Sequence, residues 1–203
     1  MAAGTPLPSA DARAASFRDR SRPESVTLAD PFEILGLEPV FLLDSSVLEQ
    51  RHRELSRALH PDRYAGRPAG ERQRALGRAI EVNEAFRALK DPIRRAEAML
   101  AKLGQPVSET DSARPDPGFL MDVMEQREAL GDARRQRDLV KVRALATAMR
   151  ERESRVTAEL ATAFVAEKPE FTRIAALVDE LRYHKRFLDE AGAIEDDLDE
   201  VRP

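Results

Sequence analysis

Residues 45–92 read SSVLEQRHRELSRALHPDRYAGRPAGERQRALGRAIEVNEAFRALKDP and predict two helices joined by a loop. Three leucines share one side of the first helix: Leu48, Leu55 and Leu59. Pro61 cannot continue this helix, and the Gly- and Pro-rich residues 64–70 are typical of a loop. In the second helix, at about 71–89, apolar residues repeat at spacings of four and three: Ala75, Ala79, Val82, Phe86 and Leu89. The two apolar sides predict an antiparallel helical hairpin.

Two shorter helices flank this hairpin. Asp30-Pro31 places a capping residue before a proline at the first helical position. Asp91-Pro92 repeats the same start before a second amphipathic segment. The four helices together predict a first domain over residues 30–103.

The rest of the chain predicts a leader, a linker and a second domain. Residues 1–29 show no apolar periodicity, so we expect a disordered leader. Residues 104–118 are rich in proline and are expected to form a linker. An antiparallel three-helix bundle is predicted over residues 119–195, followed by an acidic tail over 196–203, and residues 195–200 are expected to fray. The expected helices of this bundle span about 119–130, 134–166 and 171–191.

The composition supports an all-α fold. The chain has 203 residues, of which 34% are charged and 5% are aromatic. Ala, Leu, Glu and Arg dominate while β-branched residues are scarce, a balance that favours helix over sheet. Because the chain has no cysteine, it forms no disulfide, no thiolate-ligated metal site and no cysteine nucleophile. We therefore expect an all-α protein that carries out no thiol chemistry itself.

The hydropathy pattern predicts no contact with a membrane. No apolar segment approaches the roughly 20 residues needed to cross a bilayer. Residues 1–29 contain four arginines, as an organellar transit peptide would, but their three carboxylates are atypical of that class. We expect a soluble cytoplasmic protein of bacterial type, with the mitochondrial matrix as the alternative.

Charge is distributed unevenly along the chain. The formal net charge is −4, yet residues 51–78 hold eight arginines against three carboxylates. Residues 104–203 hold 16 basic and 22 acidic groups. Such asymmetry indicates a partner of opposite charge. An acidic protein surface fits better than nucleic acid, because residues 30–103 carry 13 basic and 12 acidic groups and so have a net charge of only +1.

The tripeptide His60-Pro61-Asp62 closes the first helix of the hairpin. Pro61 fixes the backbone, Asp62 supplies an anionic acceptor at the turn, and His60 offers a hydrogen-bond donor. Arg53 and Arg57 precede His60 by seven and three residues, which predicts that all three share one helical face. This arrangement makes a small polar docking point. The alternative is that His60 only caps the helix C-terminus and Asp62 is an ordinary turn residue.

Two chemical roles for this tripeptide fit poorly. A metal site needs a third ligand, and the nearest candidate, His52, aligns with the apolar side of its helix and is interpreted as structural. Catalysis needs a nucleophile, a base and an oxyanion donor, and the chain does not assemble these. We therefore expect a protein that is not an enzyme and has no catalytic residue, metal or cofactor.

The first domain resembles the J-domain family, co-chaperones that stimulate the ATPase of DnaK-class heat-shock chaperones. The resemblance rests on His60-Pro61-Asp62 between two helices and on NEAFRALKDP at 83–92. The opening DPFEILGL at 30–37 is also similar to the start of the family. This resemblance implies an N-terminal J-domain.

The second domain extends the resemblance to the HscB family, J-domain co-chaperones of iron–sulfur cluster assembly. The matching stretches are RAE at 95–97, GFLMDVMEQRE at 118–128 and LRY at 181–183. The resemblance runs from about Asp30 to Leu198. It implies that the C-terminal bundle is the client and oligomerisation domain, and that a chain without thiols acts on the protein that holds the cluster.

The partners implied by the resemblance are an HscA- or DnaK-class chaperone ATPase and an IscU-type scaffold protein. The implied chaperone-binding residues lie in and before the tripeptide loop: His60, Pro61, Asp62, Arg53, Arg57 and Arg63. The implied client-binding residues lie on the bundle: Leu120, Met121, Met124, Glu125, Glu128 and Tyr183. Arg63 stands where the family commonly has lysine, which keeps the charge but changes the hydrogen-bonding geometry.

The apolar part of the client set has a simpler alternative. Leu120, Met121 and Met124 recur at helical spacing, and such residues are more often core. The resemblance favours an adaptable surface with an acidic rim instead. Phe187 follows Tyr183 by one helical turn, and it fits either the client patch or the core.

Two other functions stay open at this stage. A general J-domain co-chaperone for protein folding would serve DnaK and would ignore IscU. A basic helical hairpin that binds nucleic acid would use the arginines of residues 51–78 without the tripeptide.

Overall fold

The computed structural model describes residues 30–105 and 117–200, and every regular element within them is helical. The elements are α1 (Pro31–Leu35), α2 (Ser45–Ala58), the 3-10 helix η2 (Pro61–Tyr64), α3 (Ala69–Lys90), α4 (Pro92–Lys102), α5 (Pro117–Arg135), α6 (Leu139–Phe164) and α7 (Phe171–Glu200). The expected all-α fold is confirmed. The expected leader, most of the expected linker and residues 201–203 lie outside the described residues.

Aspartate caps begin three of the first four α-helices. The carboxylates of Asp30, Asp44 and Asp91 accept hydrogen bonds from the backbone N–H two residues on, at 2.9, 2.7 and 2.9 Å. Each bond satisfies a donor that the first helical turn leaves without an intrahelical partner. Gly36 ends α1 in the left-handed region, at φ 63°, where glycine has no steric penalty. The starts at Asp30 and Asp91 lie where the sequence pattern predicts them.

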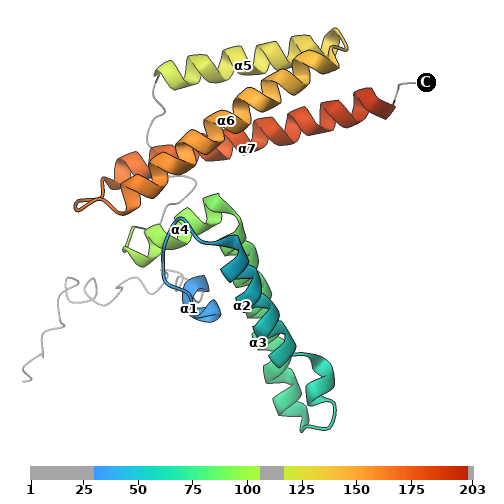
Figure 1. Cartoon of the computed structure of the whole chain (residues 1–203), viewed down its shortest axis with the longest axis vertical. Helices are drawn as coiled ribbons and strands as arrows, with labels where there is room; N and C mark the ends of the chain where they lie inside the picture. The colour runs from blue at the N-terminus through green and yellow to red at the C-terminus, as the bar shows by residue number, and fades with distance from the viewer. Residues whose placement is uncertain (1–29, 106–116, 201–203) are drawn as a thin grey trace, which may run out of the picture.

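Helices α2 and α3 form the expected antiparallel hairpin, and α1 packs across α3 (Figure 1). The seam buries Leu48 from α2 against Val82, Ala85 and Leu89 from α3. His52 also lies in this seam, where its ring stacks on Phe86 with centroids 4.1 Å apart. The structural interpretation of His52 is therefore confirmed.

Helices α5, α6 and α7 form the bundle, in which α6 and α7 make the longest contact (Figure 1). A small core closes the end nearest the α5–α6 turn: Leu130, Ala133, Val142, Ala146, Met149, Phe187, Ala191 and Ile194. Phe187 is only 2% exposed. It therefore belongs to the core rather than to a client surface.

The larger core joins the hairpin to the bundle. It runs from Phe32 and Leu35 through α4 to Leu160 and Leu177. This continuity means that the hairpin and the bundle pack as one body.

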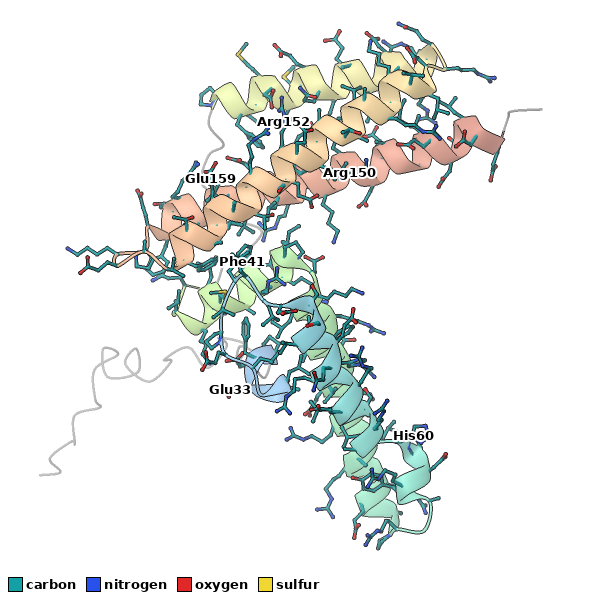
Figure 2. The ribbon with its side chains drawn as sticks, in the orientation of Figure 1. Glu33, Phe41, His60, Arg150, Arg152 and Glu159 are labelled. Atoms are coloured by element: carbon teal, nitrogen blue, oxygen red, sulfur yellow. The ribbon has the colours of Figure 1, made fainter. Side chains whose placement is uncertain are left out.

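Contacts at the junction of hairpin and bundle reinforce this core. The Phe41 ring stacks on Phe164 of α6, with centroids 5.5 Å apart, at the meeting point visible in Figure 2. Arg182 of α7 donates to Glu97 of α4 at 2.6 Å. The sequence pattern predicted a linker between two domains but not this shared interior.

Helix α5 is longer than the pattern predicted. We expected the first bundle helix to end at about Leu130 and the next to begin at about Arg134, but α5 continues through Gly131 to Arg135. Ala133 is fully buried, so packing of the last turn outweighs the helix-weakening effect of glycine. The break comes at Arg137, in the left-handed region at φ 53°, and α6 begins directly after Asp138.

Helix α7 also exceeds its predicted length. The tail expected over 196–203 is helical as far as Glu200, so the expectation of fraying over residues 195–200 is wrong. Leu198 continues the apolar stripe and packs on the small core. Arg143 of α6 forms ion pairs with Glu195 and Asp199, at 3.3 and 2.9 Å. These contacts offset the repulsion among the acidic residues. None of the described helices is long and apolar enough to cross a membrane.

Candidate functional site

The tripeptide loop lies at the free end of the hairpin, far from the bundle (Figure 2). Helix α2 ends at Ala58, and Leu59 is its C-cap. A residue before proline is disfavoured in the helical region, so His60 takes extended backbone angles of φ −60° and ψ 134°. Pro61 then opens the 3-10 helix η2 rather than directly ending α2. His60 thus lies beyond the helix, and the predicted sharing of one helical face with Arg53 and Arg57 does not hold.

The His60 ring caps η2. Its Nδ1 accepts a hydrogen bond from the backbone N–H of Asp62 at 3.3 Å. The alternative cap at the C-terminus of α2 is therefore not what the structure shows. With Nδ1 as the acceptor, the neutral ring carries its proton on Nε2. The ring thus has a donor left for a partner.

The two side chains beside Pro61 are open to solvent. The side chain of His60 is 59% exposed and that of Asp62 is 90% exposed. The Asp62 carboxylate lies 3.5 Å from His60 Nδ1. Imidazole and carboxylate are therefore presented together, on a backbone that proline stiffens.

The arginines near this loop differ in their pairing. Arg53 forms an exposed ion pair with Glu49 at 3.3 Å. Among the described residues, neither Arg57 nor Arg63 forms an ion pair. Their charges are therefore available to a partner.

An apolar surface patch, defined by Leu120, Met121 and Met124, occupies the first turns of α5. These side chains are 45, 65 and 71% exposed, so the alternative that they form core is wrong. Glu125 and Glu128 are also exposed beside them. Helices α6 and α7 lie between α5 and the hairpin, so the helix that carries the patch lies on the side of the bundle away from the hairpin (Figure 1).

Tyr183 lies under α5 rather than on the open patch. Its hydroxyl donates to the carbonyl of Val123 at 3.2 Å. The ring meets Phe119 edge-on, with centroids 5.8 Å apart. Burial raises the pKa of Tyr183, so the phenol stays protonated as this donor. Tyr183 therefore supports the helix that carries the patch.

Two polar features beneath α5 were not predicted. Arg152 of α6 forms an ion pair with Asp122 of α5 (Figure 2). His184 is 4% exposed, and its Nδ1 is buried without a hydrogen-bond partner in the described structure. Burial, and then the charge of Arg152, lower the pKa of His184. Nothing in the local sequence signals these contacts, because the partners are 30 or more residues apart.

No group of three His, Cys, Asp or Glu side chains in the described ranges is arranged to hold a metal ion. The polar surfaces of this part of the chain consist instead of single side chains and ion pairs.

Comparisons with known proteins agree on one family. The sequence profile described as "HSCB C-terminal oligomerisation domain" matches residues 115–192. The chain is similar to the "Co-chaperone protein HscB homolog" of Shewanella baltica (strain OS155 / ATCC BAA-1091), with 37% identity over 169 residues, 82% of this chain and 97% of that protein. The homologue of Shewanella frigidimarina is 34% identical over the same shares.

Solved structures give the same result. The structure of "Chaperone HscB from Vibrio cholerae" superposes with a TM-score of 0.74 and 30% identity, covering 83% of this chain and 99% of that chain. The human co-chaperone protein HscB superposes with a TM-score of 0.73 at 22% identity, covering 87% and 83%. Because the human protein is only 22% identical, its similarity supports the fold alone.

Proposed function

Because the chain belongs to the HscB family of co-chaperones, we propose that it delivers an IscU-type scaffold protein to an HscA-type chaperone and stimulates ATP hydrolysis there. The observation that carries this proposal is the pair of exposed surfaces on one continuous body. The tripeptide loop His60-Pro61-Asp62 lies at the free end of the hairpin, and the apolar surface patch lies on the outer side of the bundle.

The geometry of the tripeptide loop supports chaperone docking. His60 offers the Nε2–H donor and Asp62 offers a carboxylate that is 90% exposed. Pro61 removes backbone freedom, so less conformational entropy is lost when a partner binds. Arg53, Arg57 and Arg63 supply positive charge for an acidic chaperone surface.

The exposure of the apolar surface patch supports client binding. An exposed cluster of Leu120, Met121 and Met124 has no role in the interior of this chain. Methionine adapts to irregular apolar surfaces, and the acidic Glu125 and Glu128 give the cluster a polar rim. We assign these five residues to the IscU contact, with Tyr183 holding their helix in place.

The shared core supports coupling between the two partners. A client on α5 and a chaperone at the tripeptide loop are held at a fixed separation by packed helices. Once one partner is bound, the encounter of the client with the chaperone becomes effectively intramolecular. We place the ATPase chemistry wholly in the chaperone and the activity in the cytoplasm.

Stimulation of a purified HscA-type ATPase, measured with and without IscU, tests this proposal. The expected result is a rate with both proteins that exceeds the sum of the rates with either alone. A general J-domain co-chaperone would stimulate DnaK equally well, and IscU would add nothing. Absence of stimulation in every combination would contradict the proposal.

A further inference from the structure

The sulfur atoms of this protein divide sharply between core and surface. The sequence has five methionines and no cysteine, and four of the methionines lie within the described residues. Met99 and Met149 are 8% and 1% exposed, whereas Met121 and Met124 are 65% and 71% exposed. Within the described ranges, the thioethers that solvent reaches freely are therefore the two of the apolar surface patch. We call Met121 and Met124 the patch methionines.

The patch methionines present their thioethers side by side. They lie three residues apart in the first turns of α5, which places them on one face of that helix. Leu120 completes this face, and the exposed Glu125 and Glu128 border it. A chemical change at both sulfurs therefore alters one small, continuous surface.

The attachment of α5 to the bundle does not use these sulfurs. The Tyr183 hydroxyl donates to the carbonyl of Val123, and Arg152 forms an ion pair with Asp122. Neither contact involves a thioether. A change at the patch methionines thus alters the outward surface of the helix without removing the contacts that hold it.

The tripeptide loop is chemically separate from the patch methionines. Residues 30–90, which include the whole hairpin, contain no methionine and no cysteine. A mild oxidant that attacks sulfur therefore leaves His60 and its surroundings unchanged. The client-facing and chaperone-facing surfaces differ in their sensitivity to such an oxidant.

Hydrogen peroxide converts an accessible thioether into a sulfoxide. A lone pair of the sulfur attacks one peroxide oxygen, so an S–O bond forms as the O–O bond breaks. The sulfur loses two electrons, the peroxide gains them, and the second oxygen leaves as water after proton transfer. The apolar side chain becomes polar, with an oxygen that accepts hydrogen bonds. Burying that oxygen at an apolar interface without a donor costs free energy.

We propose that Met121 and Met124 form an oxidation site, through which peroxide reversibly blocks binding of the scaffold client. This inference rests on the proposed function, because the client is the IscU-type protein assigned to the apolar surface patch. The oxidised protein still engages the chaperone through the tripeptide loop but no longer delivers the client. Methionine sulfoxide reductases restore the thioethers at the expense of a dithiol, which becomes a disulfide as water is released.

Peroxide treatment of the full-length protein, followed by peptide mapping with mass spectrometry, tests the selectivity. Trypsin places the patch methionines in the peptide over residues 103–127, Met99 in 96–102 and Met149 in 144–150. The patch methionines should gain oxygen at least about tenfold faster than the two buried ones, because peroxide reaches them without opening of the core. Equal rates at all four sites in the folded protein would overturn the inference.

Calorimetry with reduced IscU, after the peroxide has been removed, tests the consequence for binding. The affinity should fall at least about tenfold, because two polar oxygens have to be buried at an apolar contact. The urea midpoint should stay unchanged, since both side chains lie outside the core. Treatment with both epimer-specific reductases and dithiothreitol should restore the affinity. Undiminished affinity of the fully oxidised protein would overturn the inference.

Two leucine variants assign the effect to these sulfurs. Met121→Leu/Met124→Leu keeps the apolar volume and removes the thioethers. Its affinity for IscU, whatever the starting value, should change by less than about twofold on peroxide treatment. Met99→Leu is the matched control, because it retains both patch methionines and should lose affinity as the unaltered protein does. An equal loss in the double variant would place the sensitive group elsewhere and overturn the inference.

The outcomes separate this inference from the proposed function. An untreated protein that does not bind IscU contradicts the proposed function, and the inference falls with it. An untreated protein that binds IscU, together with an oxidised protein that binds it equally well, overturns the inference alone. In the expected result, the oxidised protein stimulates HscA as before when IscU is absent, but IscU adds no further stimulation.

Discussion

His60 uses one ring nitrogen within the molecule and leaves the other for a partner. Nδ1 accepts the backbone N–H of Asp62, so Nε2 carries the proton and is available as a donor. This division of the ring explains why the residue type matters at a position that is 59% exposed. The imidazole does both at once, because Nδ1 accepts the backbone N–H at the start of η2 while Nε2–H points its donor to a partner.

Replacing His60 by glutamine should therefore remove the stimulation of HscA. We expect the stimulated ATPase rate to fall by about tenfold or more, towards the rate of the chaperone alone. Binding of IscU should be unchanged, because the apolar surface patch is remote from the loop. Steady-state ATPase measurements check the loss of stimulation, and calorimetry with IscU checks the unchanged affinity. Full stimulation by the variant would contradict the assignment of His60 to the chaperone contact.

His184 predicts a dependence of stability on pH. Burial, and then the charge of Arg152, lower its folded pKa below the ordinary value of 6.5, while Asp122 opposes them and Arg155 adds to them. The folded state therefore holds His184 neutral, whereas the unfolded state takes up a proton below about pH 6.5. The stability that comes from burying a neutral His184 is therefore present above about pH 6.5 and is lost as the pH falls below that value.

The expected result is a lower urea midpoint at about pH 5.5 than at about pH 7.5. His184→Leu should show a smaller difference between the two conditions, because the titrating group is gone. Equal pH dependence in the variant and the unaltered protein would show that other groups carry the effect.

Local residue roles were predictable from sequence where the interaction is local. The aspartate caps act on backbone groups two residues away, so the sequence pattern contains both partners. The ion pair of Arg152 with Asp122 and the hydrogen bond of Tyr183 to Val123 join residues 30 and 60 positions apart. No spacing rule reports such contacts, so the hydrogen bond that ties Tyr183 to α5 was not predictable from the sequence.

Among the elements, α5 is attached in two different ways along its length. Its fully buried residues, Leu130 and Ala133, lie in the last two turns. Its first turns are held by the Tyr183 hydroxyl, by the Asp122 ion pair and by the contact of Phe119 with the Tyr183 ring. This polar attachment lets the outward side of the first turns remain apolar and accessible.

The double variant Leu120→Ser/Met121→Ser should weaken IscU binding. We expect at least about a tenfold loss of affinity by calorimetry, since two aliphatic side chains would no longer be buried at the interface. Unfolding free energy should change little, because both residues are largely exposed. Val165→Ser is the control, as Val165 is 82% exposed directly after the last residue of α6 and outside the patch. Unaltered affinity in the double variant would remove the patch from the client contact.

Tyr183→Phe separates support of the helix from contact with the client. Losing the hydrogen bond to Val123 should cost about 1 kcal/mol of unfolding free energy, measured by urea denaturation. Affinity for IscU should stay within about twofold, because the ring remains and the hydroxyl points inward. A large loss of affinity with unchanged stability would place the hydroxyl in the interface instead.

Helix existence was predictable, but two helix ends were not. The Asp-Pro pairs mark helix starts by supplying a cap and a fixed dihedral angle, and those starts agree with the structure, whereas α2 ends at Ala58, before Pro61. The first bundle helix was expected to end at about Leu130, yet α5 continues past this residue because Ala133 is buried against the bundle. The end of α7 depends likewise on ion pairs with Arg143 from another helix.

At the scale of the whole molecule, the larger core is shared between hairpin and bundle. Residues of α1 and α4 and residues of α6 and α7 exclude water from one another. Periodicity identified each apolar face but not its partner, because any helix face can pack on any other. This is why the sequence indicated two domains and a linker, whereas the structure has a common interior.

Phe41→Ala should therefore affect more than the loop in which it lies. Phe41 is 3% exposed and stacks on Phe164, so we expect a loss of about 3–5 kcal/mol of unfolding free energy. The stimulation by IscU and the co-chaperone together should also fall towards the sum of the separate rates, since the fixed separation is lost. Leu42→Ala is the neighbouring control, because Leu42 is 67% exposed. Normal synergy in a destabilised but folded Phe41→Ala protein would show that rigid coupling is dispensable.

The shared core also limits how this protein can be recombined. Residues 30–103 cannot simply be replaced by another J-domain. The apolar face of α4 and the Phe41 ring complete the interior of the bundle. A J-domain grafted from a co-chaperone with a free-standing hairpin would leave Leu160, Ile174 and Leu177 open to water. Replacing one domain by that of another protein would therefore require matching changes on both sides of the junction. We expect residues 30–103 and the bundle to have evolved together.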